Sequence, residues 1–248
     1  MQLQLSTWQE VDAYLTRSQT IILPFGSTEQ HGPTGLIGTD ALCPAAIAEA
    51  VGEATGTLIG PAFAIGMAQH HMGFAGTMTL RPSTIIAMVH DAVSSLALHG
   101  FRRFYFLNGH GGNIATLSTA FSAFHAELSL DPDQTESPDI RLKQRNWWDG
   151  NRFRALSAEY YGAAEGTHAT CSEISLSNYL YPDHVKSAVL DPEIAPRGPI
   201  LDAADFRRRF PDGRMGSNPS LCSVAHGKRI FEAARDDVID DLSQSFRD

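Results

Sequence analysis

Glu29, His31 and Asp40 are the residues whose types and spacing most directly indicate chemistry. They lie in a loop broken by glycine and proline, directly after the apolar run at residues 20–23. Glu29 and His31 are two positions apart, so in extended backbone both side chains point to the same side, and glycine lets the chain bring Asp40 back towards them. Carboxylate oxygen and imidazole nitrogen suit zinc, manganese or iron, and one aspartate can bridge two such ions. We therefore expect a metal site here; the alternatives are a solvated surface loop and, for Asp40, a helix N-cap.

A second candidate group follows a strand predicted at residues 103–107. This strand runs into the turn N-G-H-G-G-N at residues 108–113, and a helix is predicted from residue 114 to residue 128. Strand, turn and helix form one crossover unit, so we expect His110 at the carboxyl end of a strand, where open parallel sheets bind their ligands. The alternative is a phosphate-cradling turn in which His110 is incidental, and the absence of a G-K-[ST] ending argues against it.

His168 and Glu173 lie at the predicted start of another helix, near Cys171 or Ser172. They are within about two turns of each other, and the helix start would orient both side chains. Both are therefore candidates for the same site, with a structural role as the alternative for His168.

Two aromatic pairs are further candidates. His70 and His71 lie in a long irregular stretch before residue 80, and each ring is compatible with facing either a site or solvent. Trp147 and Trp148 follow a strand predicted at residues 140–144 and form either a wedge in the core or a wall of a substrate pocket.

Size and composition favour a single α/β domain spanning residues 1–248, because 248 residues of which 43% are apolar can bury a sizeable core. The formal charge of -9 and the pI near 5.5 argue against a nucleic-acid partner, since neutralising phosphates requires a dense basic face. The short basic cluster at residues 207–209 is expected on the solvated side of a helix.

The cysteines are Cys43, Cys171 and Cys222, which lie far apart and form no C-x-x-C spacing. Neither a disulfide framework nor a thiolate zinc site is indicated, and a reducing cytoplasm fits best. No apolar run approaches the roughly eighteen residues of a membrane span, and the first residues lack the regions of a signal peptide. We expect a cytoplasmic protein without a membrane partner.

Helical and strand patterns alternate along the chain, with caps predicted at several helix starts. Thr7 and Glu10 form a capping box, Thr39 or Asp40 is available to cap the second helix, and Ser83 is expected to cap the third. Residues 129–139 are predicted to be an exposed linker. Residues 181–219 are predicted to cover the domain without contributing catalytic residues. The predicted helices are 7–17, 42–54, 83–98, 114–128, 203–210 and 223–246, and the predicted strands are 20–23, 57–59, 103–107 and 140–144.

Four stretches match one pattern in order and spacing. They are G-S-x-E-Q-H-G-P with a following T-D, H-x-x-F-x-G-T, N-G-H-G-G-N, and H-A-x-x-x-E-x-S, at residues 26–40, 71–77, 108–113 and 168–175. Together they resemble the creatininase (creatinine amidohydrolase) family, and the resemblance runs from about residue 5 to about residue 180.

The resemblance implies a three-layer α/β/α sandwich with a mostly parallel sheet, often assembled as a homohexamer. It implies two divalent ions at the carboxyl ends of the strands, zinc with zinc, manganese or iron at the second site. His168 matches the histidine that the family uses for proton transfer, and Glu173 is expected to take part in catalysis as well as in metal binding. The implied metal ligands are Glu29, His31, Asp40 as the bridge, His110 and Glu173; we expect substrate contacts from His71, Phe74, Thr77, Trp147 and Trp148.

The resemblance further implies hydrolysis of a non-peptide C–N bond in a small cyclic amide or formamide by water activated between two cations. The alternative function is a phosphate or nucleotide binder that uses the turn at residues 109–112 without metal catalysis.

Two positions depart from the family pattern. Gly112 stands where creatininases proper carry the glutamate of N-G-H-x-E-N, and Thr170 and Ile174 replace glycine and threonine in H-A-G-x-x-E-T-S. A missing glutamate leaves an open coordination position and one more positive charge, so we expect a looser second metal, a larger or more anionic amide, and little creatinine hydrolysis.

Overall fold

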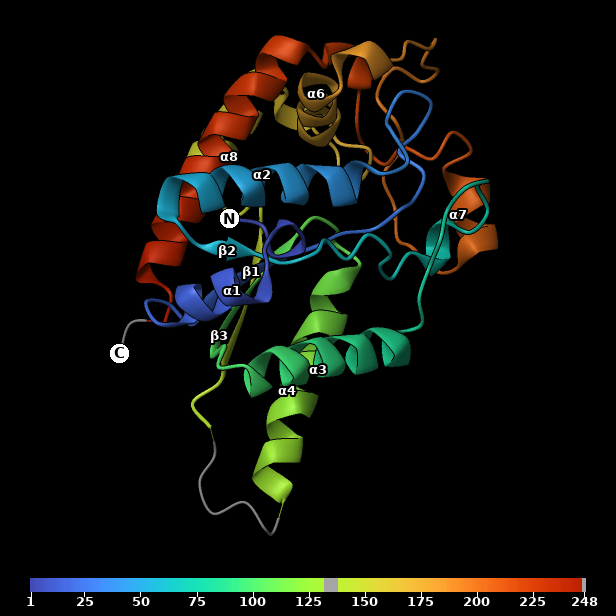
Figure 1. The fold of residues 1–248 in the computed structure, drawn as a ribbon. Helices are drawn as coiled ribbons and strands as arrows, with labels where there is room; N and C mark the ends of the chain where they lie inside the picture. Colours follow the sequence, from blue (N-terminus) through green and yellow to red (C-terminus); the bar gives the residue numbers. More distant parts are fainter. Residues whose placement is uncertain (132–137, 247–248) are drawn as a thin grey trace.

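The computed structural model describes residues 1–131 and 138–246 and places a four-stranded parallel sheet at the centre of the chain (Figure 1). The strand order is β2-β1-β3-β4, formed by β1 (Thr20–Phe25), β2 (Leu58–Ile59), β3 (Arg103–Asn108) and β4 (Arg141–Asn146). In β1 and β3 every residue after the first is buried, as expected of parallel strands covered on both faces. All four predicted strands are present, and their bounds shift by one or two residues.

Helices cover both faces of the sheet, which makes three layers (Figure 1). One layer contains α2 (Thr39–Thr55), α5 (Asn151–Tyr160), α6 (Cys171–Leu180) and α8 (Val224–Gln244); the other contains α1 (Trp8–Leu15), α3 (Pro82–Leu98) and α4 (Asn113–Leu130). The predicted three-layer α/β/α architecture is confirmed.

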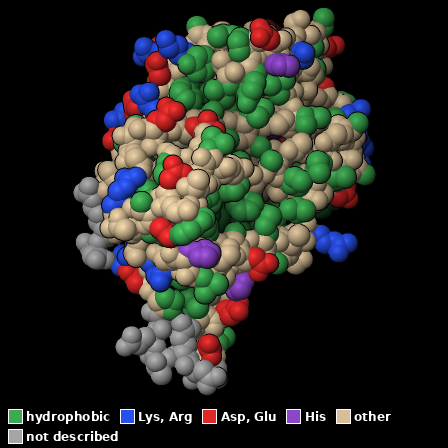
Figure 2. Space-filling model, viewed as in Figure 1, with side chains coloured by type: hydrophobic (Ala, Val, Ile, Leu, Met, Phe, Trp, Pro, Cys, Tyr) green, Lys and Arg blue, Asp and Glu red, His purple; other side chains and the backbone are tan. Residues whose placement is uncertain are grey.

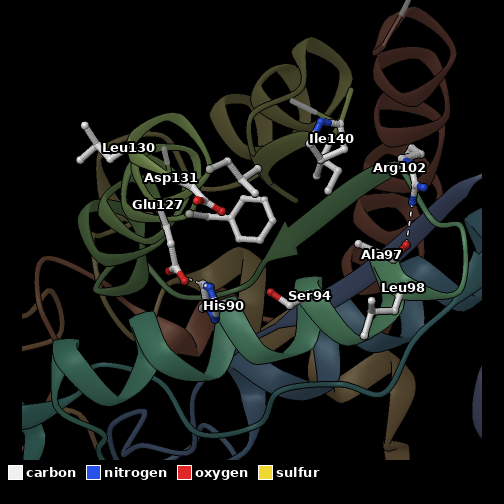
Figure 3. A pocket seen from close by; sticks show the side chains of 12 residues that line it. His90, Ser94, Ala97, Leu98, Arg102, Glu127, Leu130, Asp131 and Ile140 are labelled. Carbon is white, nitrogen blue, oxygen red and sulfur yellow. Dashed lines mark hydrogen bonds and ion pairs between the residues drawn. The ribbon is translucent and has the colours of Figure 1, made fainter. Parts of the chain in front are cut away.

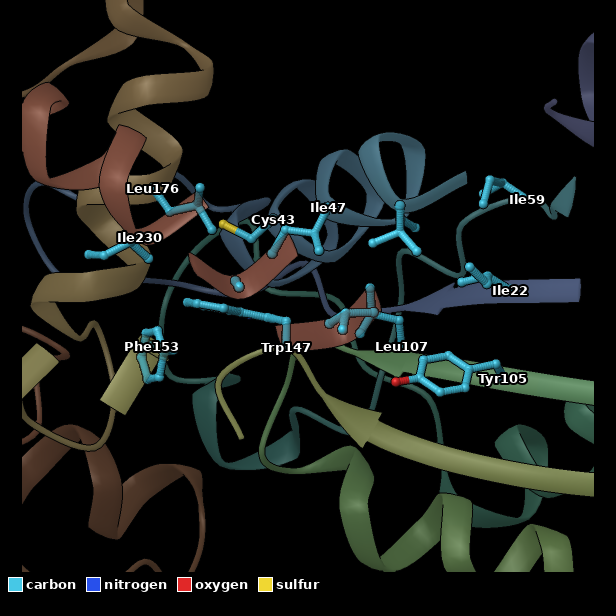
Figure 4. Packing of buried hydrophobic residues seen from close by; sticks show 14 of the residues in the cluster. Ile22, Cys43, Ile47, Ile59, Tyr105, Leu107, Trp147, Phe153, Leu176 and Ile230 are labelled. Carbon is cyan, nitrogen blue, oxygen red and sulfur yellow. The ribbon is translucent and has the colours of Figure 1, made fainter. Parts of the chain in front are cut away.

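The core is divided in two by the alternation of side chains along the strands. Ile22, Tyr105 and Leu107 pack with Ile47 of α2 and Ile230 of α8 (Figure 4). The intervening strand residues, such as Ile21, Leu23 and Phe106, pack against α1, α3 and α4 on the opposite face. Both faces of the central strands are therefore dry, and the chemistry of the chain lies in the loops and helix starts at the strand ends.

The predicted capping box at α1 is present, but two other predicted caps are wrong. Thr7 accepts a hydrogen bond from the backbone N–H of Glu10, and the Glu10 side chain accepts one from Thr7. In α2 the N-cap is Gly38, since the oxygens of Asp40 face histidine rings and not the backbone. In α3 the N-cap is Arg81 rather than Ser83, because Pro82 suits the first helical position and has no N–H to satisfy.

The segment from residue 181 to residue 219 folds over the carboxyl ends of the strands. Its helix α7 (Ala203–Arg209) packs on the short helix η2 (Gln69–His71) beside the carboxyl edge of the sheet (Figure 1). The basic cluster of α7 is exposed, as predicted, with Arg208 and Arg209 paired to Asp205. The remaining short 3₁₀ helices are η1 (Leu3–Leu5), η3 (Gly162–Ala164), η4 (Pro182–His184) and η5 (Pro219–Leu221).

The surface carries little organised chemistry at the amino ends of the strands. A groove of about 780 Å³ lies there between α3 and α4, and its polar contacts are the His90–Glu127 ion pair and a hydrogen bond from Arg102 to the carbonyl of Ala97 (Figure 3). On the face in Figure 2, basic side chains are scattered near the outline, whereas apolar ones occupy its middle. None of the helices in the described residues is both long and apolar enough to cross a bilayer. Most of the predicted linker at 129–139 lies outside the described residues.

Candidate metal centre

The start of α2 carries Asp40 into the space between the ends of β1 and β3. Gly26 follows β1 and Gly109 follows β3, and a Cβ atom added to either would collide with the backbone carbonyl of Asp40. Only glycine therefore allows the turn of α2 to approach both strand ends this closely. Gly26 and Gly109 therefore allow Asp40 to reach its position at the site.

Asp40 lies between two imidazoles. His31 Nε2 is 2.9 Å from its Oδ1, and His110 Nδ1 is 2.9 Å from its Oδ2. All three side chains are buried. One carboxylate thus spans two histidines that come from loops about eighty residues apart, the arrangement expected of a bridging group.

Glu29 is fully buried on the other side of His110. Its Oε2 lies 3.3 Å from His110 Nε2 and accepts a hydrogen bond of 2.8 Å from Ser27, while its Oε1 lies 3.1 Å from His71 Nε2. The predicted ligand Glu173 stands at the start of α6, where it completes a capping box with Thr170, and its Oε1 is 3.8 Å from His31 Nε2.

The donor atoms form three groups that could each hold a metal ion, with the atoms of a group within 4.8 Å of one another. Two buried oxygens in these groups, Oε1 of Glu29 and Oδ2 of Asp40, lie within 3.1 Å of an imidazole nitrogen. Neither accepts a hydrogen bond of acceptable geometry in the described part of the chain. An orphaned buried acceptor is costly unless a cation satisfies it. The residues present therefore fit divalent metal. The groups are Glu29 with His31 and His168, Glu29 with Asp40 and His110, and His31 with Asp40 and Glu173.

Without a bound metal ion, the charges around these residues favour protonation of His31, His110 and Glu173. Burial alone would lower the pKa of His31, but Asp40, with Glu173 and Glu29, raises it to about 10. His110 shows the same balance, because burial is outweighed by Glu29 and Asp40 and its pKa rises to about 9. Burial raises the pKa of Glu173 to about 7, whereas the adjacent His31 charge holds that of Asp40 below its usual range.

His168 lies beside this group with a different environment. Its Nδ1 is 3.7 Å from Glu29 Oε1, and its Nε2 is 2.9 Å from the backbone carbonyl of Gln30. Burial, reinforced by the neighbouring His71 and His31, holds its pKa well below the usual value. A neutral imidazole in this position can accept a proton, as its predicted role requires.

Gln30 is a residue that the sequence analysis missed, although it stands inside the first motif. Its Nε2 lies 2.9 Å from His71 Nδ1, from His168 Nε2 and from the carbonyl oxygen of Gly213. It therefore ties two histidines to the segment that covers the site. Its position between Glu29 and His31 was the available signal.

The site opens into a pocket of about 570 Å³. Of the residues predicted to contact substrate, His71, Trp147 and Trp148 line it, whereas Phe74 and Thr77 lie outside its wall. Phe74 packs against Phe206 and Arg207, and Thr77 accepts a hydrogen bond from the Gln30 backbone. Trp147 is only 2% exposed and also belongs to the core (Figure 4), so the predicted core position is present, and its role as a substrate wall stays a prediction.

The segment at residues 181–219, which was predicted only to cover the site, also contributes side chains to it. Phe206 of α7 places its ring edge-on to His71 with ring centroids 4.6 Å apart, and Met215 joins the pocket wall. The fully buried Arg214 binds the carbonyls of Pro192, Glu193 and Ser217, which closes this segment on itself. The apolar partners of these side chains lie far away in sequence, so no local pattern indicates their role.

The open coordination position expected from Gly112 stays a prediction, but the surroundings of this glycine are tight. A Cβ atom added there would collide with the His110 ring and the carbonyl of Met67. His110 Nε2 lies 2.9 Å from that carbonyl, so the imidazole itself fills the space that a longer residue at 112 would claim.

A parallel three-layer fold with carboxylates and imidazoles clustered at the carboxyl ends of its strands suits a metal-dependent hydrolase. The family model for creatininase, described as creatinine amidohydrolase, matches residues 4–242. The chain belongs to the creatininase family and is a hydrolase of that family.

Similar proteins differ in what they act on. Creatinine amidohydrolase of Pseudomonas putida is 29% identical over 97% of this chain and 95% of its own length. A 3-dehydro-scyllo-inosose hydrolase of Thermotoga maritima is 32% identical over 99% of this chain and 82% of its own. A mycofactocin precursor peptide peptidase of Mycobacterium ulcerans is 28% identical over 91% and 85%.

Solved creatininase structures share the fold over the whole chain. A creatininase crystal structure aligns with a TM-score of 0.85 and 27% identity, covering 100% of this chain and 98% of its own. A manganese form of creatininase aligns with a TM-score of 0.84 and 27% identity over 100% and 99%.

Proposed function

We propose that this protein is a metal-dependent amidohydrolase that cleaves a non-peptide C–N bond in a small cyclic amide or formamide. The observation that carries the proposal is a pair of buried oxygens without a hydrogen-bond donor, on Glu29 and Asp40, set among histidine nitrogens, with Asp40 lining the pocket. The residues that would hold two divalent ions are Glu29, His31, Asp40, His110 and Glu173. The manganese and zinc–zinc forms of related creatininases support zinc or manganese as the ions.

Metal bound here would supply a nucleophilic hydroxide near neutral pH and stabilise the oxyanion of a tetrahedral intermediate. The side chains of the protein balance charge, transfer a proton and limit the access of water. Asp40 balances charge between His31 and His110, and His168, neutral in its buried position, accepts and returns a proton at Nδ1. Gln30 holds the ring of His168 at Nε2, and Trp147 and Trp148 form an apolar wall that limits water around the amide.

The phosphate-binding alternative is disfavoured by the charges beside the turn at residues 109–112. The buried carboxylates of Glu29 and Asp40 face His110 within that turn. Fixed negative charge at this distance repels a phosphate.

We further propose a single-domain cytoplasmic protein that assembles as a homo-oligomer, a hexamer by family resemblance, without a nucleic-acid partner. One sheet with a match across residues 4–242 supports the single domain. The free cysteines Cys43, Cys171 and Cys222 suit a reducing compartment.

The proposal predicts amide hydrolysis that depends on added metal. Purified protein, stripped by a chelator and reloaded with zinc or manganese, is assayed against creatinine, other small cyclic amides and formamides. We expect turnover of at least one amide in the reloaded enzyme and loss of turnover after chelation. Equal rates with and without metal, or phosphate-dependent stabilisation with no metal uptake, would contradict the proposal.

Creatinine itself is expected to be a poor substrate. The family pattern that the chain resembles has a glutamate where this chain has Gly112, and a Cβ atom at Gly112 would collide with the His110 ring. Metal-loaded enzyme with kcat/KM for creatinine of about 10⁴ M⁻¹s⁻¹ or more would show that Gly112 does not exclude it.

A further inference from the structure

The pocket contains a carboxylate that the proposed chemistry does not use. Glu165 lines the same pocket as Asp40, His110 and Glu173, but it belongs to none of the groups that could hold metal. It lies between η3 and the start of α6, where it accepts hydrogen bonds from the hydroxyl and, at 3.2 Å, the backbone N–H of Ser172.

Glu165 has no cationic partner in the described residues. No lysine, arginine or histidine nitrogen there lies within 4 Å of it, unlike Glu29, Asp40 and Glu173, which all face imidazoles. Burial raises the pKa of Glu165 to about 6, while hydrogen bonds from Ser172 and Ser157 act to lower it. A largely buried carboxylate without a counter-charge is costly to ionise, and Glu165 lines the pocket, where a cationic ligand could offset that cost.

The neighbours of Glu165 in the pocket suit an organic cation. Trp148 and Phe153 supply aromatic surface to the same pocket, and the Ser157 side chain donates a hydrogen bond to Glu165. A protonated amine is attracted both to a carboxylate and to aromatic faces. Glu29, Asp40 and Glu173, by contrast, would bind the metal ions in the loaded site and would not be available to an organic cation.

We propose that Glu165 forms a subsite for a protonated amino group on the substrate, so that the substrate is a small amide or formamide with a cationic nitrogen. This rests on the proposed amidohydrolase function, and it reverses the expectation of a more anionic amide drawn from Gly112. The competing role for Glu165 is structural, since its bonds to Ser172 also hold the start of α6 and thereby Glu173.

The test uses two nearly isosteric formamides, N-formyl-1,3-diaminopropane, which is cationic, and N-butylformamide, which is neutral. Metal-loaded wild type, Glu165→Gln and the exposed control Glu159→Gln are compared at pH 7.5. We expect wild type and control to favour the cationic amide by about ten- to a hundredfold in kcat/KM, the size of a charge-assisted hydrogen bond. In Glu165→Gln the ratio is expected to fall to near one with full metal content.

Failure of the subsite and failure of the proposed function give different results. If neither formamide is hydrolysed, the amidohydrolase proposal fails, and titration calorimetry with propylammonium chloride still tests the subsite directly, with sodium chloride as the blank. We expect wild type to bind propylammonium at least about tenfold more tightly than Glu165→Gln.

Three outcomes would overturn the subsite: a wild-type ratio near one, an unchanged ratio in Glu165→Gln, or equal propylammonium binding by both proteins. Metal loss in Glu165→Gln with an unchanged substrate ratio would assign the residue to the structure of α6. If the variant does not fold, competitive inhibition of neutral-amide turnover by propylammonium in wild type decides the question; its absence overturns the proposal.

Discussion

At the scale of single residues, the centre balances buried carboxylates against imidazoles, and this makes metal uptake a competition with protons. The charges of nearby carboxylates raise the pKa of His31 to about 10 and of His110 to about 9, and burial raises that of Glu173 to about 7. All three groups must lose protons before they can ligate a cation.

We therefore predict that metal affinity rises with pH between pH 6 and pH 8, by about tenfold per pH unit for each proton released. The sign follows because protonated His31, His110 and Glu173 dominate at low pH and repel or fail to bind a cation. Calorimetry in two buffers of different ionisation enthalpy measures the protons released per ion. An affinity that is flat across this range would contradict the assignment of these ligands.

His168 gives a second test at this scale. His168→Ala is expected to retain metal and to lose about two to four orders of magnitude in kcat, the usual contribution of proton transfer. Gln30 and Glu29 stay in place because neither depends on His168 alone. Since His168 also lies in a possible ligand group with Glu29 and His31, loss of metal in this variant would make it a ligand instead.

The sequence predicted the residues that share a short motif, and it missed those whose role depends on distant partners. Glu29 and His31 are two positions apart, and Asp40 follows them through a glycine-rich loop, so their convergence is local. Gln30 binds a carbonyl more than 180 residues away, and the role of Glu165 emerges only when α6 and the tryptophan wall meet. Both lie within or beside recognised motifs, yet spacing alone cannot show what they face.

At the scale of elements, helix starts position much of the site. α2 carries Asp40, α6 carries Glu173, and α5 carries the pocket residues Phe153 and Ser157. The sequence predicted α2 and the start of α6, but it missed α5 (Asn151–Tyr160). Two caps were misplaced because Asp40 and Ser83 have other partners or better competitors. A cap depends on which side chain reaches the first N–H groups, and tertiary packing decides that.

The start of α5 is capped from another helix. Its N-cap Gly150 offers no side chain, and the buried Asp237 of α8 accepts hydrogen bonds from the backbone N–H groups of Arg152 and Phe153. Asp237→Ala is expected to lower the free energy of unfolding by about 1–3 kcal/mol, since these donors stay buried without an acceptor.

Urea unfolding measures this, with Asp240→Ala as the matched control. Asp240 is 57% exposed in its side chain and only pairs with Arg152, so its loss is expected to cost about 0–1 kcal/mol. Equal losses in the two variants would show that the backbone cap contributes nothing.

At the scale of the whole molecule, the fold directs its polar groups to one edge. Two apolar clusters fill both faces of the sheet, and the segment from residue 181 to residue 219 closes over the carboxyl ends. The pattern of strands and helices in the sequence indicated an α/β domain, and the resemblance to the creatininase family implied its three layers. The contribution of Phe206 and Met215 to the site could not be predicted, because the residues they meet there lie far away in the sequence.

The central claim is that this edge holds divalent metal through a bridging Asp40. Mass spectrometry of zinc- or manganese-loaded protein measures it most directly, with wild type compared against Asp40→Ala and the exposed control Asp91→Ala. We expect up to two ions per chain in wild type and control, and loss of most metal together with amide hydrolysis in Asp40→Ala. Metal content in Asp40→Ala equal to that of wild type would contradict the claim.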